Sequence, residues 1–188
     1  MEATQICSYI IVPETKSIRA EFNDNGECHS LILEGDYTFK VDVKPIEIID
    51  ESLKYYGFDL NGAISGSRAI LGQCKAVPVR IPGEVDMYWF PHTSPGQEEC
   101  VWFALHHVEA IMPEDKDISN VYVSGGHCFK LNAAEKDLSY KYDRTEKLES
   151  RISKRRVNTF SFIMERTRDI YSVEKGKRNY IITRKKDK

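Results

Sequence analysis

Three glycines in a short stretch raise the possibility of a phosphate-binding loop. The stretch YYGFDLNGAISGS (residues 55–67) contains Gly57, Gly62 and Gly66, and four residues separate the first two. A phosphate-binding loop needs a Lys directly after its last glycine, followed by Ser or Thr to hold Mg²⁺. Here Ala63 follows Gly62. Because that cation is missing, we interpret the stretch as a helix that ends at Gly57, followed by a flexible loop.

Neighbouring cysteines and histidines could ligate a metal ion. Such pairs occur at Cys28–His29 and His127–Cys128, but neither has a CxxC or HxxxH spacing beside it. The chain has five cysteines, an odd number at wide spacing. Because the N-terminus shows no export signal, we expect reduced and mostly buried thiols. The sequence predicts no metal site.

Two adjacent histidines lie in the apolar stretch CVWFALHHVEAIM (residues 100–112). If this stretch is a strand, neighbouring side chains point to opposite faces, so His106 and His107 are poorly placed to bind one ion. No GxSxG motif or other catalytic constellation accompanies them. We therefore expect a protein that is not an enzyme and needs no cofactor.

The composition is typical of a globular protein. The 188 residues suffice for one domain of ordinary size, and 41 % of them are hydrophobic, which allows a sizeable core. No apolar run approaches the roughly 18 residues needed to cross a membrane. The N-terminus also lacks the features of a signal peptide. We expect a cytoplasmic protein without membrane association.

The first two thirds of the chain predict a mostly antiparallel β-sheet. Short apolar segments are separated by turn signals such as NDNG (residues 23–26). Residues 100–112 are apolar on both faces, as in a central strand, and Pro78 places its strand at an edge. Gly125 and Gly126 mark the turn of a hairpin. The predicted strands are 6–12, 17–22, 28–35, 37–43, 76–81, 87–90, 100–112 and 120–131.

Two helices complete the expected α+β fold. A short helix is predicted near 45–57, because Pro45 suits a first helical turn and Gly57 suits the end of a helix. A long C-terminal helix is predicted near 133–156, with Asn132 as its N-cap.

Charge is distributed unevenly along the chain. Residues 130–188 contain 18 Lys or Arg and 9 Asp or Glu, a net charge of +9. Since the whole chain carries −2, residues 1–129 carry −11. This asymmetry indicates nucleic acid or another anionic partner, although the two parts could instead neutralise each other. We divide the chain into an acidic β-rich core, 1–131, and a basic helical region, 132–188, within one integrated domain.

The basic residues of the predicted long helix gather on one face. At about 100° per residue, the apolar stripe consists of Leu138, Tyr142, Thr145, Leu148 and Ile152. The neighbouring basic stripe consists of Arg144, Lys147, Arg151, Lys154 and Arg155. A solvated helix usually mixes its charges to form i,i+4 pairs. The sorting favours an anion-binding face, and a solvated surface helix is the alternative.

Five landmarks follow one another in the middle of the chain. They are KPIEIIDESLKYYG, the glycine stretch NGAISGS, the VPVRI strand, the WFPH turn and CVWFALHHVEAI. In this order they resemble the ComK family of competence transcription factors. The resemblance is clearest over residues 45–111, and the helix SYKYDRTEKLESRISKRR is compatible with it.

This resemblance implies a bacterial activator that switches on genes for DNA uptake. It would bind double-stranded, A/T-rich promoter DNA mainly through the minor groove, as a dimer or higher oligomer associated with the nucleoid. The narrow A·T minor groove attracts Arg, whereas Lys more often contacts phosphates. The DNA-binding residues are then expected to be Arg68, Lys75, Arg144, Lys147, Arg151, Lys154, Arg155 and Arg156.

The resemblance also implies control by a Clp-protease adaptor. The segment TFSFIMER lies where such a contact is expected, and its candidate partner-binding residues are Phe160, Phe162, Ile163 and Met164.

One position departs from the family pattern. Family members usually carry two basic residues directly after the middle glycine, where this chain has Ala63 and Ile64. An alternative is therefore a ComK-like paralogue with weakened DNA binding. Such a protein would act through protein contacts, either by forming mixed oligomers or by occupying the protease adaptor.

Overall fold

The computed structural model describes residues 8–158, 169–172 and 181–184. It has the predicted α+β fold, in which neighbouring strands pair antiparallel. The chain divides into two compact units, Met1–Ile152 and Ser153–Lys188. The second unit contains a hairpin of β10 (Asp169–Ser172) and β11 (Ile181–Arg184).

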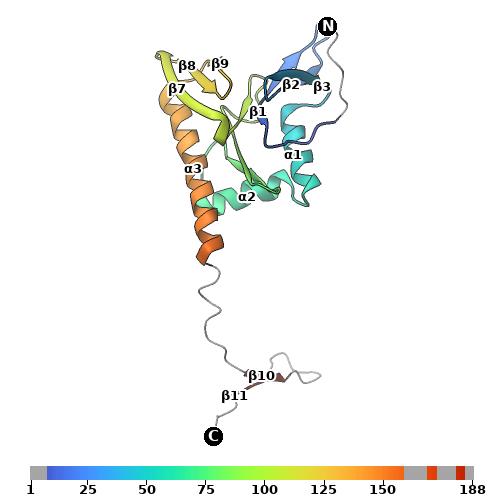
Figure 1. Ribbon diagram of the computed structural model, residues 1–188, viewed down its shortest axis with the longest axis vertical. Coiled ribbons are helices and arrows are strands. Elements are labelled where there is room, and N and C mark those ends of the chain that lie inside the picture. The colour runs from blue at the N-terminus through green and yellow to red at the C-terminus, as the bar shows by residue number, and fades with distance from the viewer. Residues whose placement is uncertain (1–7, 159–168, 173–180, 185–188) are drawn as a thin grey trace. The chain divides into compact units, whose positions relative to one another are not determined.

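The main sheet of the first unit has six strands in the order β3-β2-β1-β6-β5-β4. Figure 1 labels three of them, β1, β2 and β3. The strands are β1 (Thr15–Phe22), β2 (Cys28–Glu34), β3 (Tyr37–Val41), β4 (Val79–Ile81), β5 (Met87–Pro91) and β6 (Val101–Ala104). β4, which follows Pro78, lies at an edge as predicted. Every residue of β5 and β6 is buried, because both faces of this part of the sheet are covered.

Side chains that alternate across β5 and β6 divide the core into two layers. Trp89 and Trp102 are buried on one face, together with apolar side chains of α1 (Pro45–Tyr55). Phe90 and Phe103 are buried on the opposite face, with residues of the smaller sheet and of α3 (Glu135–Asn158). The six-stranded sheet is therefore the middle layer of this unit.

The smaller sheet has three strands in the order β7-β8-β9. They are β7 (Val108–Asp115), β8 (Ile118–Val123) and β9 (His127–Leu131). β8 and β9 form the predicted hairpin, and the two glycines at its turn, Gly125 and Gly126, have φ angles of +83° and +80°. Only glycine adopts such left-handed angles without a steric cost, so the turn depends on this pair.

Replacing Gly125 by Ala is expected to destabilise the fold more than replacing Gly126. Both changes force Ala into a left-handed conformation, which costs about 1 kcal/mol. A Cβ at Gly125 would also lie 2.8 Å from Nζ of Lys16, whereas nothing lies within 4 Å at Gly126. Lys16 is buried and donates to the Ser124 carbonyl at 2.8 Å, so it cannot easily move away.

Urea unfolding of the two variants isolates this clash. We expect Gly125→Ala to lower the free energy of unfolding by about 1 kcal/mol more than Gly126→Ala. Equal losses in the two variants would show that Lys16 does not fix the hairpin turn.

The end of α1 confirms the role predicted for Gly57. Its φ angle is +82°. The Gly57 N–H donates to the Lys54 carbonyl at 2.9 Å, and the Phe58 N–H donates to the Leu53 carbonyl at 3.0 Å. This pair of hydrogen bonds is the Schellman motif, which satisfies carbonyls that a helix end leaves free.

The prediction of a flexible loop after Gly57 was wrong, because residues 60–71 form the helix α2 (Leu60–Leu71). Its N-cap is Asp59, whose carboxylate accepts the Gly62 N–H at 2.8 Å. The Leu60 N–H donates to the Asp50 carboxylate at 2.9 Å. These two carboxylates satisfy backbone donors at the helix start and offset the low helix propensity of glycine.

Two predicted strands also differ in the structure. Of the strand predicted at 6–12, the described residues 8–12 are not in a strand. Ile11 is nevertheless buried, and its N–H donates to the Ser52 hydroxyl of α1 at 3.0 Å. The strand predicted at 100–112 is broken by a 3₁₀ turn, Leu105–His107, where the chain passes from the large to the small sheet.

None of the helices described is both long and apolar enough to cross a membrane.

Candidate functional site

The C-terminal end of α2 presents backbone carbonyls to α3. The last carbonyls of a helix have no partner within it, and this end carries a partial negative charge. Nη2 of Arg144 donates to the carbonyls of Leu71 at 3.0 Å and of Gly72 at 3.4 Å. Nη1 of Arg151 donates to the Ile70 carbonyl. Two arginines of α3 therefore cap α2. The ribbon of α2 runs up to α3 in Figure 1.

Apolar packing holds the two helices together beneath these contacts. Leu71 and Leu148 are buried in one cluster with Tyr88 and Leu105, and Ile152 packs against it. The guanidinium of Arg144 also lies over the Tyr140 ring, 5.7 Å from its centroid. Arg144 is thus fixed from two sides, by a ring and by carbonyls.

Three further cations lie close along the chain to the residues that form this junction. Arg68 is in the last turn of α2, and Lys75 follows Gly72 by three residues. Lys147 is on α3 between Arg144 and Arg151. All three side chains are exposed, and within the described residues none of them forms an ion pair. We call Arg68, Lys75, Arg144, Lys147 and Arg151 the basic cluster.

The basic cluster joins residues that the sequence places far apart. Arg68 and Lys75 come from the glycine region, and the other members come from the long helix. The sequence predicted all five as DNA-binding residues, but it did not show that α3 contacts the end of α2. It also missed the carbonyls of α2, because capping by a distant arginine leaves no local sequence signal. DNA contact by Arg144 and Arg151 stays a prediction.

Acidic residues of α3 lie apart from the basic cluster. Burial, together with the nearby carboxylates Glu146 and Asp86, raises the pKa of Glu149. Burial and the carboxylate of Glu146 likewise raise the pKa of Tyr142. These carboxylates make this side of α3 electrostatically negative, whereas the sorted cations make the side with the basic cluster positive.

The remaining predicted site residues belong to the second unit. Lys154, Arg155 and Arg156 are exposed in the last turns of α3. The four predicted partner-binding residues Phe160, Phe162, Ile163 and Met164 lie outside the described residues.

The adjacent histidines have structural contacts. They lie in a 3₁₀ turn rather than the expected strand, with ring centroids 5.7 Å apart. Nε2 of His107 is 2.7 Å from the Pro13 carbonyl, and its Nδ1 is 2.8 Å from the Ser124 hydroxyl. A proton on Nε2 satisfies both contacts, since Nδ1 then accepts from the hydroxyl.

The cysteines among the described residues are free but less buried than expected. Of the four in the described part of the chain, Cys100 is buried, Cys28 and Cys74 are half-buried and Cys128 is exposed. His29 contacts the Asp42 carboxylate at 2.6 Å. No group of three or more His, Cys, Asp or Glu suited to a metal ion occurs among the described residues.

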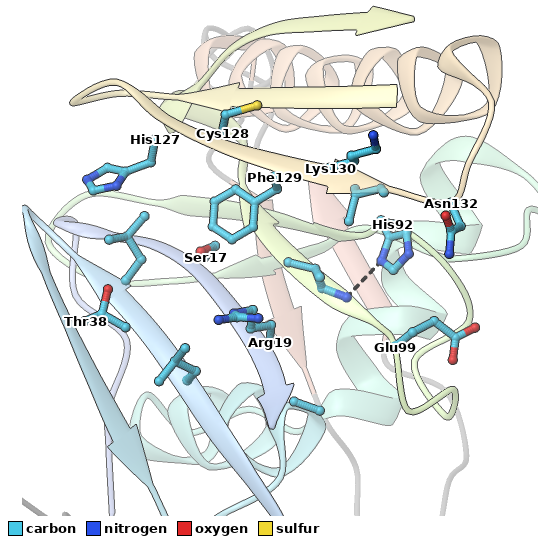
Figure 2. Close-up of a pocket in the computed structure, with 15 residues that line it drawn as sticks. Ser17, Arg19, Thr38, His92, Glu99, His127, Cys128, Phe129, Lys130 and Asn132 are labelled. Carbon is cyan, nitrogen blue, oxygen red and sulfur yellow. Dashed lines mark hydrogen bonds between the residues drawn. The ribbon is translucent and has the colours of Figure 1, made fainter. Parts of the chain in front are cut away.

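Sequence reasoning missed a hollow of about 560 Å³ between the two sheets (Figure 2). Its walls come from β1, β2, β3 and β9, and polar side chains such as Arg19, Glu99 and His92 reach it. His92 is 4 % exposed, and its Nδ1 accepts the Val101 N–H at 2.8 Å. Nε2 of the neutral ring must then carry the proton.

Replacing His92 by Asn is expected to flatten the pH dependence of stability. Burial, aided by the Lys141 ammonium, lowers the pKa of His92 to about 4. In the unfolded chain the pKa of a histidine is about 6.5. Between this pH and about 4, the imidazole of His92 therefore binds a proton in the unfolded chain but not in the folded protein. The wild type therefore loses roughly 2–3 kcal/mol between pH 6.5 and 4 through this group.

Urea unfolding from pH 7.5 to 4.5 measures this contribution. In the His92→Asn variant the amide oxygen of the new side chain can accept the Val101 N–H and does not titrate, so the two proteins should match at pH 7.5. The variant should become the more stable protein as the pH falls. Parallel profiles would show that His92 becomes protonated in the folded state.

The comparisons with known proteins agree with one another. The family model "ComK protein" matches residues 6–157. The competence transcription factor of Bacillus subtilis (strain 168) is 26 % identical over 172 residues, which cover 87 % of this chain and 89 % of that protein. No solved structure is significantly similar to the chain. The family match spans most of the chain and includes α1, α2 and nearly all of α3, so the chain belongs to the ComK family.

Proposed function

We propose that this protein is a transcription regulator of competence genes that binds double-stranded DNA through the basic cluster. The observation that carries the proposal is the contact of α3 with the end of α2, because three exposed cations, Arg68, Lys75 and Lys147, lie within four residues along the chain of the contacting groups. The name of the Bacillus subtilis relative supports the biological role. An acidic body would repel DNA elsewhere and would favour an approach through this face.

The chemistry of the cluster suits A/T-rich DNA. Arg68 is the exposed arginine at the end of α2, and its guanidinium can enter a narrow, strongly negative A·T minor groove. Lys75 and Lys147 are better suited to the flanking phosphates. Arg144 and Arg151 hold the end of α2 in place, and Arg151, which is exposed, keeps N–H donors for a phosphate.

The positions after Gly62 have a packing role in this chain. Ala63 and Ile64 are half-buried and pack against the core cluster that contains Trp89 and Trp102. Apolar residues there stabilise α2, which presents Arg68. Their identity is therefore compatible with DNA binding through the other end of the helix.

We further propose that the protein acts at the nucleoid as a dimer or higher oligomer. Lys154, Arg155 and Arg156 are expected to add phosphate contacts. Phe160, Phe162, Ile163 and Met164 are expected to bind a Clp-protease adaptor. Sedimentation of the protein with and without duplex tests the oligomeric state. A complex with one protomer per duplex would contradict a dimer or higher oligomer.

Fluorescence anisotropy with two duplexes tests the proposed function. One duplex carries two boxes of A- and T-runs, and the other has the same length with G·C pairs in their place. We expect tighter binding to the A/T duplex. Equal affinity for the two duplexes would contradict recognition of A/T-rich DNA through the minor groove. No binding at moderate salt would instead favour the paralogue that acts through protein contacts.

A further inference from the structure

The free edge of β9 borders the hollow between the sheets. β9 pairs with β8 on one side and is the last strand of its sheet. All six residues 127–132 line the hollow. Because side chains alternate between the faces of a strand, a hollow beside one face would be lined by every second residue. The hollow therefore runs along the backbone edge of β9.

Side-chain directions support this placement. Figure 2 shows Phe129 pointing into the hollow, with Cys128 and Lys130 directed to the other side of β9. Cys128 and Lys130 thus line the hollow through their backbone. Within the described part of the chain, no strand pairs with this edge. Its outward N–H and C=O groups are available to an added strand.

The wall of the hollow that faces β9 carries one cationic side chain, one anionic side chain and one hydrogen-bond donor of fixed position. Arg19 of β1 and Glu99 are exposed, and neither forms an ion pair within the described residues. His92 is buried beside them, and its Nε2 proton is fixed by the hydrogen bond that Nδ1 accepts. Leu31 and Leu33 supply apolar surface. These groups suit a peptide with charged and apolar side chains, not a simple anion.

We propose that this hollow binds an extended peptide segment of a partner protein, which adds as a strand to the edge of β9. The segment carries an acidic side chain that pairs with Arg19 and a basic side chain that pairs with Glu99. Side chains on one face of a strand recur at every second residue, so these two lie two residues apart. Leu31, Leu33 and Phe129 contact the aliphatic parts of these two side chains.

The β7 edge of a second copy of this chain is a poorer occupant. The opposite edge of the same sheet is β7, whose residues Val108–Ile111 border a small cavity together with Tyr142 and Asp143 of α3. Farther along β7, Pro113 has no N–H to donate. The edge of β7 is therefore partly covered and partly unable to pair with β9 of another copy.

The test uses the full chain labelled with ¹⁵N and the probe peptide Ac-Thr-Val-Glu-Val-Lys-Val-Thr-NH₂. We expect chemical-shift changes at the amides of β9 and saturable binding. A probe that is N-methylated at the backbone nitrogens facing β9 should bind at least about tenfold more weakly, because it can no longer donate hydrogen bonds to this strand. Equal binding of the methylated probe, or shifts confined to α3, would overturn the proposal.

Charge variants test the orientation of the peptide. Glu99→Gln should weaken the probe by about two- to fivefold, as expected for an exposed ion pair. Glu98→Gln is the matched control, because Glu98 lies next to Glu99 but lines a different cavity. Arg19→Glu should weaken the probe, and a probe with Lys in place of its Glu should restore binding. Unchanged affinity in Arg19→Glu, or identical shifts with sodium acetate alone, would contradict strand addition.

Discussion

Replacing Arg68, Lys75 and Lys147 together by Gln is expected to lower the affinity for an A/T-rich duplex by about 100-fold at 0.15 M salt. Each phosphate neutralised by a cation releases counterions, which makes a contact worth about fivefold at this salt concentration relative to 1 M. Lys75 and Lys147 each lose such a contact, and Arg68 loses a contact of similar worth in the negative minor groove, so the three losses multiply to about 100-fold. Fluorescence anisotropy under identical buffer conditions measures the loss.

The triple variant should lose DNA affinity without losing stability. All three side chains are exposed, so the thermal midpoint of the triple variant should stay close to that of the wild type. Lys116→Gln is the single-charge control, because Lys116 is exposed on the turn between β7 and β8, outside the basic cluster. A loss of about fivefold in Lys116→Gln, as expected for one residue of the cluster, would mean that net charge, and not the cluster, governs binding.

Arg144→Ala is expected to lower the free energy of unfolding by about 2–3 kcal/mol. The guanidinium donates to the carbonyls of Leu71 and Gly72 and lies over the Tyr140 ring. Truncation removes charge-assisted hydrogen bonds, a favourable charge at the end of α2 and a cation–π contact. Urea unfolding measures the loss, and Arg151→Ala, at an exposed residue, should cost about 1 kcal/mol.

A DNA measurement on the same variant distinguishes the two roles of Arg144. If Arg144 acts by positioning α2, the salt dependence of duplex binding should be nearly unchanged, because no phosphate contact is lost. If Arg144 contacts a phosphate, the slope of log K against log salt should fall by about 0.9. A reduced slope together with wild-type stability would contradict the capping role.

Local chemistry made part of the fold predictable. The Schellman end of α1 needs only a glycine at the right spacing, and the hairpin of β8 and β9 needs only Gly125 and Gly126 at its turn. α2 was missed because its glycines have low helix propensity. Its capping carboxylate Asp50 belongs to another helix, so tertiary contacts overrule the local preference.

The candidate site was predictable to a similar extent. The sorting of charges along α3 follows from helical periodicity alone, so its basic face could be predicted. The capping of α2 by Arg144 and Arg151 could not, because it joins residues more than 70 positions apart. The break at Leu105–His107 was also hidden, since a continuous apolar run does not show where a chain changes sheets.

The salt dependence of duplex binding is the most direct test of the basic cluster as a DNA-binding surface. The slope of log K against log salt should be measured for the wild type and for the variant with Arg68, Lys75 and Lys147 replaced by Gln. We expect the slope of the variant to be shallower by about 2.7, which corresponds to three lost cation contacts with DNA, two at phosphates and one in the minor groove. The same slope for both proteins would show that DNA does not bind at the junction of α2 and α3.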